Sequence, residues 1–223
     1  MMMYLLVIVA FIFSLWAQFR VKGTFKKWSK VATSNGMTGY EAARHMLDTN
    51  GLSDVPIEPV RGSLSDHYDP IHRVVRLSEP VYYESSISAI SVACHEVGHA
   101  IQHKVHYPML TLRHRMFPVV NFASGVAPFM LMAGFIFGYL NLVGLGIIFF
   151  SAAVAFQLVT LPVEFNASNR ARQVMVEQGY IRNEEERGVA KVLNAAALTY
   201  VAAALVSLLE LLRLITVFLG NRD

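Results

Sequence analysis

Residues 118–161 read PVVNFASGVAPFMLMAGFIFGYLNLVGLGIIFFSAAVAFQLVTL and contain no charged side chain. The run consists of two apolar segments, Pro118–Tyr139 and Leu142–Leu161, joined by a charge-free turn at residues 139–141. Each segment is long enough for a helix that crosses the hydrocarbon core of a bilayer, which takes about 20 residues. The stretch therefore predicts a hairpin of two transmembrane helices, so the chain returns to the side of the membrane that it left.

The composition of the whole chain supports a membrane protein. Of 223 residues, 54% are hydrophobic, and the mean hydropathy is +0.42, which is too apolar for an ordinary soluble domain. The net charge is +3, but the basic residues flank apolar segments and do not form a reading surface, so we expect no nucleic-acid partner. The single cysteine, Cys94, excludes an internal disulfide and is interpreted as a small buried residue.

Two further apolar segments lie near the ends of the sequence. Residues 3–17 carry no charge and lack the features of a cleaved secretory signal, so we interpret them as an anchor that Gln18 and Phe19 extend toward the interface. Residues 195–220 contain alanines that permit close helix packing, and Glu210 and Arg213 are spaced to pair. The predicted fold class is a mainly α polytopic membrane protein with about four transmembrane helices.

The basic residues predict the orientation of these segments. No Lys or Arg precedes the first span, whereas five follow it closely: Arg20, Lys22, Lys26, Lys27 and Lys30. By the positive-inside rule, the part of the chain after this span lies in the cytosol. The predicted spans make the lipid bilayer a partner of the chain. Five basic residues after the hairpin agree with a return to the cytosol: Arg170, Arg172, Arg182, Arg187 and Lys191.

The region between the first span and the hairpin has the mixed composition of a small soluble domain. Thr38 and Glu41 form a capping-box pattern, which predicts a helix through Leu47 that Asn50-Gly51 ends. Residues 55–60 contain two prolines and predict a short edge strand, and residues 72–78 predict a second strand. His67 and Tyr68 lie between them, in a stretch that Asp and Pro residues assign to a loop.

A histidine pair four residues apart occurs in His95-Glu96-Val97-Gly98-His99, on a helix that Ser85-Ser86 begins. Positions four apart share a helix face, so both imidazoles can reach one ion. A catalytic zinc ion accepts such ligands and keeps one position for water, whose proton Glu96 is placed to take. The pattern predicts one Zn²⁺ per chain with Glu96 as base. We expect this helix, too polar for a lipid-facing span, to lie against the bilayer or the other spans.

The third zinc ligand has to come from elsewhere in the chain. His103 lies about 12 Å from His95 along a straight helix, too far to share one ion, so His103 and His106 are interpreted as outer or surface residues. Glu164 emerges at the end of the hairpin on the side of the histidine pair, where an isolated carboxylate beside lipid would be costly. We take Glu164 as the ligand, although it could be an interfacial anchor. The competing carboxylates are Glu177, Glu184, Glu185, Glu186 and Glu210.

Six stretches together resemble the YugP-like neutral zinc metallopeptidases of bacterial membranes: residues 37–39 (MTG), 64–70 (LSDHYDP), 75–78 (VRLS), 95–102 (HEVGHAIQ), 162–168 (PVEFNAS) and 194–205 (NAAALTYVAAAL). The resemblance implies a multi-pass zinc peptidase of the bacterial cell (plasma or inner) membrane. It implies His95 and His99 as ligands and Glu96 as the base, and it supports Glu164.

Three features of the site stay open in the sequence. In gluzincins the ligand glutamate often begins E-x-x-x-D, whose Asp supports a zinc-bound histidine; Ser168 stands there in this chain, so Ser168, Asn166 or an aspartate such as Asp66 or Asp69 takes that role. The donor to the oxyanion is His67 or Tyr68. The strand at residues 72–78 either holds an extended substrate along its edge or is structural.

The predicted organisation is a transmembrane anchor (1–19), a cytosolic catalytic domain (20–117), a transmembrane hairpin (118–162), a cytosolic helical segment with the third ligand (163–194) and a last transmembrane helix (195–220). The predicted activity is zinc-dependent cleavage of peptides, with membrane-protein or juxtamembrane segments as substrates, at the cytosolic face.

Two other functions can use an H-E-x-x-H motif. An intramembrane site-2-type protease needs the motif inside an apolar span and a later aspartate ligand, and Asp223 is the one Asp after the motif. A non-catalytic scaffold or assembly factor could bind zinc without using a base. The sequence has no G-x-x-x-x-G-K-[ST] motif, so energy-driven unfolding of a substrate would require a partner such as a membrane ATP-dependent protease.

Overall fold

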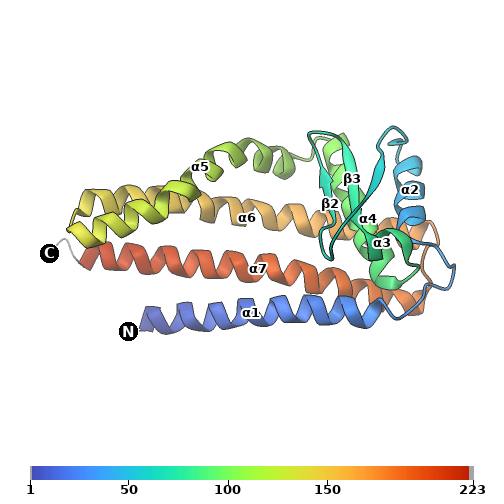
Figure 1. Cartoon of the computed structure of the whole chain (residues 1–223), viewed down its shortest axis with the longest axis horizontal. Helices are drawn as coiled ribbons and strands as arrows, with labels where there is room; N and C mark the ends of the chain where they lie inside the picture. The colour runs from blue at the N-terminus through green and yellow to red at the C-terminus, as the bar shows by residue number, and fades with distance from the viewer. Residues whose placement is uncertain (1, 221–223) are drawn as a thin grey trace. The chain divides into compact units, whose positions relative to one another are not determined.

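The computed structural model describes residues 2–220, a range that does not include Asp223. Within it the chain forms seven helices and one three-stranded sheet (Figure 1). Four helices are long and apolar enough to cross a membrane: α1 (Met2–Trp28), α5 (Pro108–Phe137), α6 (Leu140–Glu177) and α7 (Asn183–Gly220). The predicted fold class, mainly helical with four candidate spans and a short β element, is confirmed.

The chain divides into two compact units. One, here called the membrane unit, contains the described residues up to Gln18, Pro108–Pro162 and those from Leu198 on. The other, here called the site unit, contains Phe19–Tyr107 and Val163–Ala197. Three long helices, α1, α6 and α7, contribute residues to both units. All residues that the sequence predicts for the metal site belong to the site unit.

Within the membrane unit, helix α5 begins ten residues before the span predicted from hydropathy. It includes Pro118 and Pro128 in its interior, and the turn to α6 is shorter than predicted, with Gly138 at a positive φ of 70°. Arg213 forms an ion pair with Glu210 on α7, as predicted, and its guanidinium lies 5.1 Å from the centre of the Tyr4 ring on α1.

The sheet of the site unit has the order β1-β3-β2. Strand β1 (Ile57–Val60) runs parallel to β3 (Val74–Ser78), and β2 (His67–Asp69) runs antiparallel to β3. The predicted edge position of the proline-containing strand is confirmed. The prediction of a loop at His67 and Tyr68 is wrong, because these residues pair with Arg76 and Val75 of β3.

Strand β3 cannot hold a substrate along an edge, because both of its edges are already paired. Its burial agrees with a structural role, since four of its five residues are buried. Of the two alternatives left open for residues 72–78, the structural strand is therefore the correct one. Of the described strands next to the motif helix, β2 has an unpaired edge.

Local signals predict the helix ends well. Thr38 accepts a hydrogen bond from the Glu41 amide while the Glu41 side chain accepts one from the Thr38 amide, so the predicted capping box begins helix α2 (Gly39–Thr49). Gly179, with a φ of 69°, follows the end of α6 at Glu177, where a left-handed residue commonly ends a helix. The short helix α3 (Glu79–Tyr83) was not predicted; it follows β3 directly.

Helix α4 (Ile87–Lys104) carries the histidine pair and begins after Ser86, whose side chain accepts a hydrogen bond from the Ala89 amide. Of its residues only Lys104 is exposed. The predicted packing of α4 against the spans is confirmed for α6, one of the candidate spans, which α4 meets at Gly98. Elements including α2, α3 and the sheet also cover α4, so it is a buried helix and not the surface helix that its polar residues suggested. Its polar residues are tolerated there because they are hydrogen-bonded, as Ser88 is to the Phe25 carbonyl.

Candidate metal centre

Two histidines of α4 face the same point, as their spacing of four predicts. The rings of His95 and His99 lie with their centroids 4.8 Å apart and nearly perpendicular to each other. Both side chains are mostly buried, with 13% and 12% of their surface exposed. Their Nε2 atoms are therefore held in a protected site, where a third ligand can meet them.

Glu164 of α6 meets the two histidines there. Its Oε2 atom lies 3.3 Å from His95 Nε2 and 3.6 Å from His99 Nε2, and the residue is 2% exposed. The three ligand atoms lie within 4.8 Å of one another. Among the described residues, this is the one group of three or more His, Cys, Asp or Glu side chains with a geometry able to hold a metal ion.

The competing carboxylates do not join the cluster of His95, His99 and Glu164. Glu177 contacts Gln173, and Glu185 contacts Ser34. Glu186 pairs with Arg172 and Glu210 pairs with Arg213, and Glu184 is not part of the described cluster.

Two of the three separations between the ligand atoms fit a zinc ion. With bonds of about 2.0–2.1 Å and tetrahedral angles, two ligands of one zinc ion lie roughly 3.3 Å apart. The two distances from Glu164 Oε2 are close to that edge, whereas the three ligand atoms as a group are up to 4.8 Å apart, which is wider. Two imidazoles and one carboxylate also form the ligand set of catalytic zinc sites, in which a fourth position stays open.

Gly98 lets α4 and α6 approach each other at this point. A Cβ atom built on Gly98 would lie 2.7 Å from the carbonyl oxygen of Ala167, which is closer than real Cβ contacts. Ala167 is one turn of α6 after Glu164 and is fully buried. The H-E-x-x-H motif accepts any residue at the position of Gly98. The need for glycine there therefore comes from the contact between α4 and α6.

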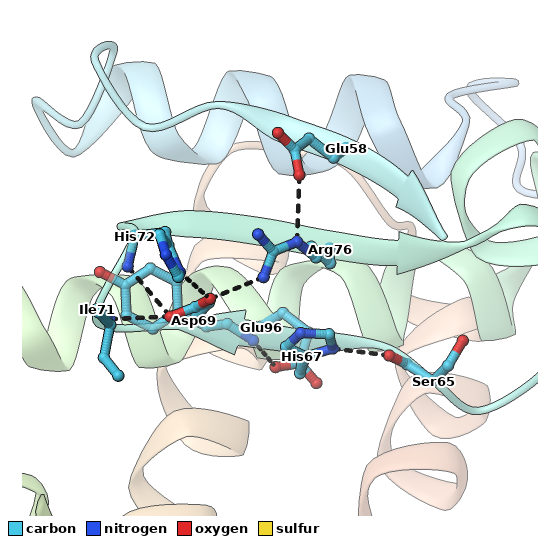
Figure 2. A network of polar contacts seen from close by, with 9 residues as sticks. Glu58, Ser65, His67, Asp69, Ile71, His72, Arg76 and Glu96 are labelled. Carbon is cyan, nitrogen blue, oxygen red and sulfur yellow. Dashed lines mark hydrogen bonds and ion pairs between the residues drawn. The ribbon is translucent and has the colours of Figure 1, made fainter. Parts of the chain in front are cut away.

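Glu96 lies under strand β2 and is 8% exposed. Its Oε2 atom accepts a hydrogen bond of 3.0 Å from the backbone amide of Tyr68 (Figure 2). Burial raises the pKa of Glu96 above that of an ordinary carboxyl; the imidazoles of His95 and His99 oppose the rise, and the Glu164 carboxylate adds to it. The carboxyl group therefore holds a proton more readily than an exposed glutamate does.

The Glu164 carboxylate also raises the pKa of His99. Burial, the largest single effect, lowers the pKa of its imidazole, but Glu164, the charge of Glu96 and the hydrogen bond with Gln102 together outweigh burial, so the pKa is raised. The raised pKa of His99 indicates that the negative oxygen of Glu164 favours a positive charge near the Nε2 atoms of the two histidines. A bound cation would take the place of that proton.

The outer nitrogen of each histidine has a hydrogen-bonding partner. His95 Nδ1 lies 3.1 Å from the Ser168 hydroxyl, and His99 Nδ1 lies 3.0 Å from Gln102 Oε1. Of the open possibilities, Ser168 therefore contacts a histidine directly, and Asn166 reaches the other one through Gln102. The sequence reasoning missed Gln102, although its place three residues after His99 on one helix face was a usable signal.

The two aspartates considered for this support belong to other contacts. Asp66 accepts hydrogen bonds from the Ser78 amide and hydroxyl at the start of α3. Asp69 lies in a network on the sheet, where its Oδ2 atom is 2.7 Å from both His72 Nδ1 and Arg76 Nη1 (Figure 2). Arg76 continues this network to Glu58 on β1.

The two oxyanion candidates differ in their surroundings. His67 is exposed, and its Nδ1 atom lies 2.8 Å from the Ser65 carbonyl. The Tyr68 hydroxyl lies 2.8 Å from His103 Nδ1. This contact joins strand β2 to helix α4. Burial raises the pKa of the Tyr68 phenol, which therefore stays protonated near neutral pH.

Comparison with known proteins agrees with this site. Residues 3–219 match the model of a family described as "Putative neutral zinc metallopeptidase". The chain is 67% identical over 223 residues to "Putative membrane protease YugP" of Bacillus subtilis (strain 168), and the match covers 100% of this chain and 99% of the relative. No solved structure is similar enough to add to the comparison. By the extent of these matches, the chain belongs to the neutral zinc metallopeptidase family.

Proposed function

We propose that the chain is a membrane-bound, zinc-dependent metalloendopeptidase in which His95, His99 and Glu164 hold one zinc ion and Glu96 is the general base. The observation that carries the proposal is the position of Glu164 Oε2, at ligand-to-ligand distance from the Nε2 atoms of both histidines. The family supports zinc and peptide substrates.

The three ligands have distinct roles in this proposal. His95 and His99 offer neutral nitrogen, and Glu164 supplies the one negative charge, so the site keeps a net positive charge when it holds a dication. When bound, zinc polarises the scissile carbonyl and lowers the pKa of its water to about 7. The burial of the three side chains restricts competing water and strengthens their electrostatic effects.

Glu96 carries the proton. Its carboxylate accepts a proton from the attacking water and returns it to the leaving amine, which requires a pKa near the working pH. Its burial supports that role, since it raises the pKa. The Tyr68 amide fixes one oxygen of the carboxylate and so limits its rotation.

The free edge of β2 is the proposed place for the substrate backbone. The Tyr68 amide points away from β3, since it donates to Glu96, and Glu96 therefore lies at this edge. An extended peptide lying along β2 would pass beside the base, and because the Tyr68 amide is already bonded to Glu96, the peptide would pair with the remaining backbone groups of this edge. Short extended segments, such as those next to membrane helices, suit an edge of three residues.

The proposed site faces the cytosol of a bacterial cell, in the plasma or inner membrane. The basic residues that follow the first span and the hairpin support this orientation. Substrates would then be membrane proteins or their juxtamembrane segments on the cytosolic side.

The substitution Glu96→Gln tests the function directly. We expect the purified variant to bind zinc as the wild type does and to lose at least about 100-fold in kcat, because the amide cannot take the proton. Cleavage by the wild type should stop with a chelator and return with added zinc. Proteolysis that persists in the variant would contradict the role of Glu96. A wild-type chain that binds zinc and cleaves no peptide would favour the scaffold function.

A further inference from the structure

Gln102 is a fully buried polar residue one turn after His99 on α4. A buried primary amide needs partners for its two N–H donors and its carbonyl oxygen. Gln102 finds them on two helices. Its Oε1 atom lies 3.0 Å from His99 Nδ1, and its Nε2 atom lies 2.8 Å from the Val163 carbonyl oxygen and 3.0 Å from Asn166 Oδ1.

The partners on α6 permit one orientation of this amide. The Val163 carbonyl can only accept a hydrogen bond. Asn166 Oδ1 also receives the Nε–H of Arg170 at 2.8 Å, and a guanidinium only donates, so the Asn166 atom at this point is its oxygen. Both groups therefore require an N–H from Gln102, and the nitrogen of its amide has to face α6.

The orientation of Gln102 in turn determines the protonation of His99. With its nitrogen directed at α6, Gln102 presents its oxygen to His99 Nδ1, and that oxygen can only accept. Nδ1 therefore carries the hydrogen, and in the neutral ring the lone pair is on Nε2, which faces Glu164. His95 differs, because the Ser168 hydroxyl beside its Nδ1 can donate or accept.

We propose that Gln102 is a positioning residue that sets the tautomer of His99 and aligns it with Glu164. The inference rests on the metal site of the proposed function. The Val163 carbonyl belongs to the peptide that joins Val163 to Glu164, so one side chain contacts a ligand of α4 and the backbone next to the ligand of α6. Gln102 thereby fixes two zinc ligands relative to each other.

The substitution Gln102→Met removes all three hydrogen bonds and keeps a similar volume. The measurement is the zinc dissociation constant of the full-length chain in detergent, by competition with a chelator, together with the absorption spectrum of the cobalt-loaded protein. We expect zinc binding to weaken by about 10–100-fold and the cobalt spectrum to change. The matched control is Gln173→Met, at an exposed position of α6, which should leave the dissociation constant within about twofold. Wild-type zinc affinity in folded Gln102→Met would overturn the proposal.

A second pair of variants covers the case in which Gln102→Met does not fold. Asn166 is half-buried. Asn166→Asp keeps an acceptor for both Gln102 and Arg170, whereas Asn166→Leu removes it. We expect Asp to retain zinc affinity within about threefold and Leu to lose about tenfold. Equal zinc affinity in the two variants would contradict the dependence on an acceptor at this position.

Zinc affinity is measured without a substrate, so this test is separate from that of the peptidase function. If the wild type cleaves no peptide but Gln102→Met weakens zinc binding, the positioning role stands and the peptidase function fails. If the wild type cleaves peptides and Gln102→Met binds zinc normally, the positioning role fails alone. A wild type that binds no zinc would overturn both.

Discussion

The backbone of Ala167 passes so close to Gly98 that a Cβ atom at Gly98 would lie 2.7 Å from the Ala167 carbonyl oxygen. Gly98 lies between the proposed ligands His95 and His99 on α4, and Ala167 follows Glu164 by one turn on α6. The separation of two metal-site helices thus depends on the absence of one side chain. A methyl group at this position has to push the backbone of α6 away, since backbone atoms cannot move aside as a flexible side chain can.

The substitution Gly98→Ala adds only one methyl group, but it should nevertheless weaken zinc binding. We expect a loss of about 1–3 kcal/mol in stability from overpacking, together with reduced zinc affinity, because Glu164 moves with its helix. Thermal unfolding with and without zinc measures both effects. The control is Gly125→Ala, where an added Cβ meets no atom within 4 Å and helix propensity favours alanine. Unchanged zinc affinity in Gly98→Ala would show that α6 adjusts without moving its ligand.

The substitution Glu164→Gln tests the third ligand. A neutral amide replaces the carboxylate that lies 3.3 Å and 3.6 Å from the two imidazoles, so we expect zinc affinity to fall by roughly 100-fold or more. Zinc content after dialysis and the dissociation constant measure the loss. The control is Glu177→Gln, on an exposed part of the same helix. Loss of zinc in the control with retention in Glu164→Gln would exclude Glu164 as the ligand.

The parts of the site that follow helix periodicity could be predicted from the sequence. His95 and His99 share a face because their spacing is four, and Glu164 was within reach because a hairpin of two spans returns the chain to one side. The prediction failed where a distant partner decides the structure. Strand β2 has three residues and exists because it pairs with β3. The roles of Gly98 and Gln102 depend on α6, whose contact with α4 no local pattern encodes.

The burial of α4 was missed for a related reason. Hydropathy marks a helix with several polar residues as a surface helix, but hydrogen bonds can satisfy those residues inside a domain. Ser91 bonds the carbonyl of Ile87, and Gln102 bonds α6. The sequence shows the polar groups without showing their partners, so it could not distinguish a surface helix from a buried one.

Asp69 should make the stability of the site unit depend on pH. Its carboxylate contacts the side chains of His72 and Arg76, and it accepts hydrogen bonds from the backbone amides of Ile71 and His72. These contacts hold the pKa of Asp69 well below the ordinary value. In the unfolded chain the pKa of an aspartate is about 3.9. Because the pKa of Asp69 is lower in the folded state, the ionised carboxylate stabilises the fold at pH values above about 3.9, and this stabilisation is lost as the pH falls below that value toward the pKa of the folded state.

The substitution Asp69→Asn should remove this contribution. We expect the apparent Tm to fall by roughly 5 °C at pH 7 and the difference from the wild type to shrink as the pH approaches about 4 and below. Thermal unfolding of both proteins across this range measures it. Glu58→Gln, at the more exposed end of the network, should have a smaller effect. A difference between Asp69→Asn and the wild type that stays constant with pH would rule out the carboxylate as its source.

The orientation of the chain can be tested with single cysteines, because Cys94 is fully buried and should not react in the folded protein. Ser63→Cys places a thiol at an exposed site before β2, and Asn141→Cys places one at an exposed site near the start of α6. If the motif faces the cytosol, a membrane-impermeant maleimide applied to intact cells should label the cysteine at 141 and leave the one at 63 unlabelled until the membrane is opened. The reverse pattern would place the metal site on the outer face, and its substrates would then have to be sought there.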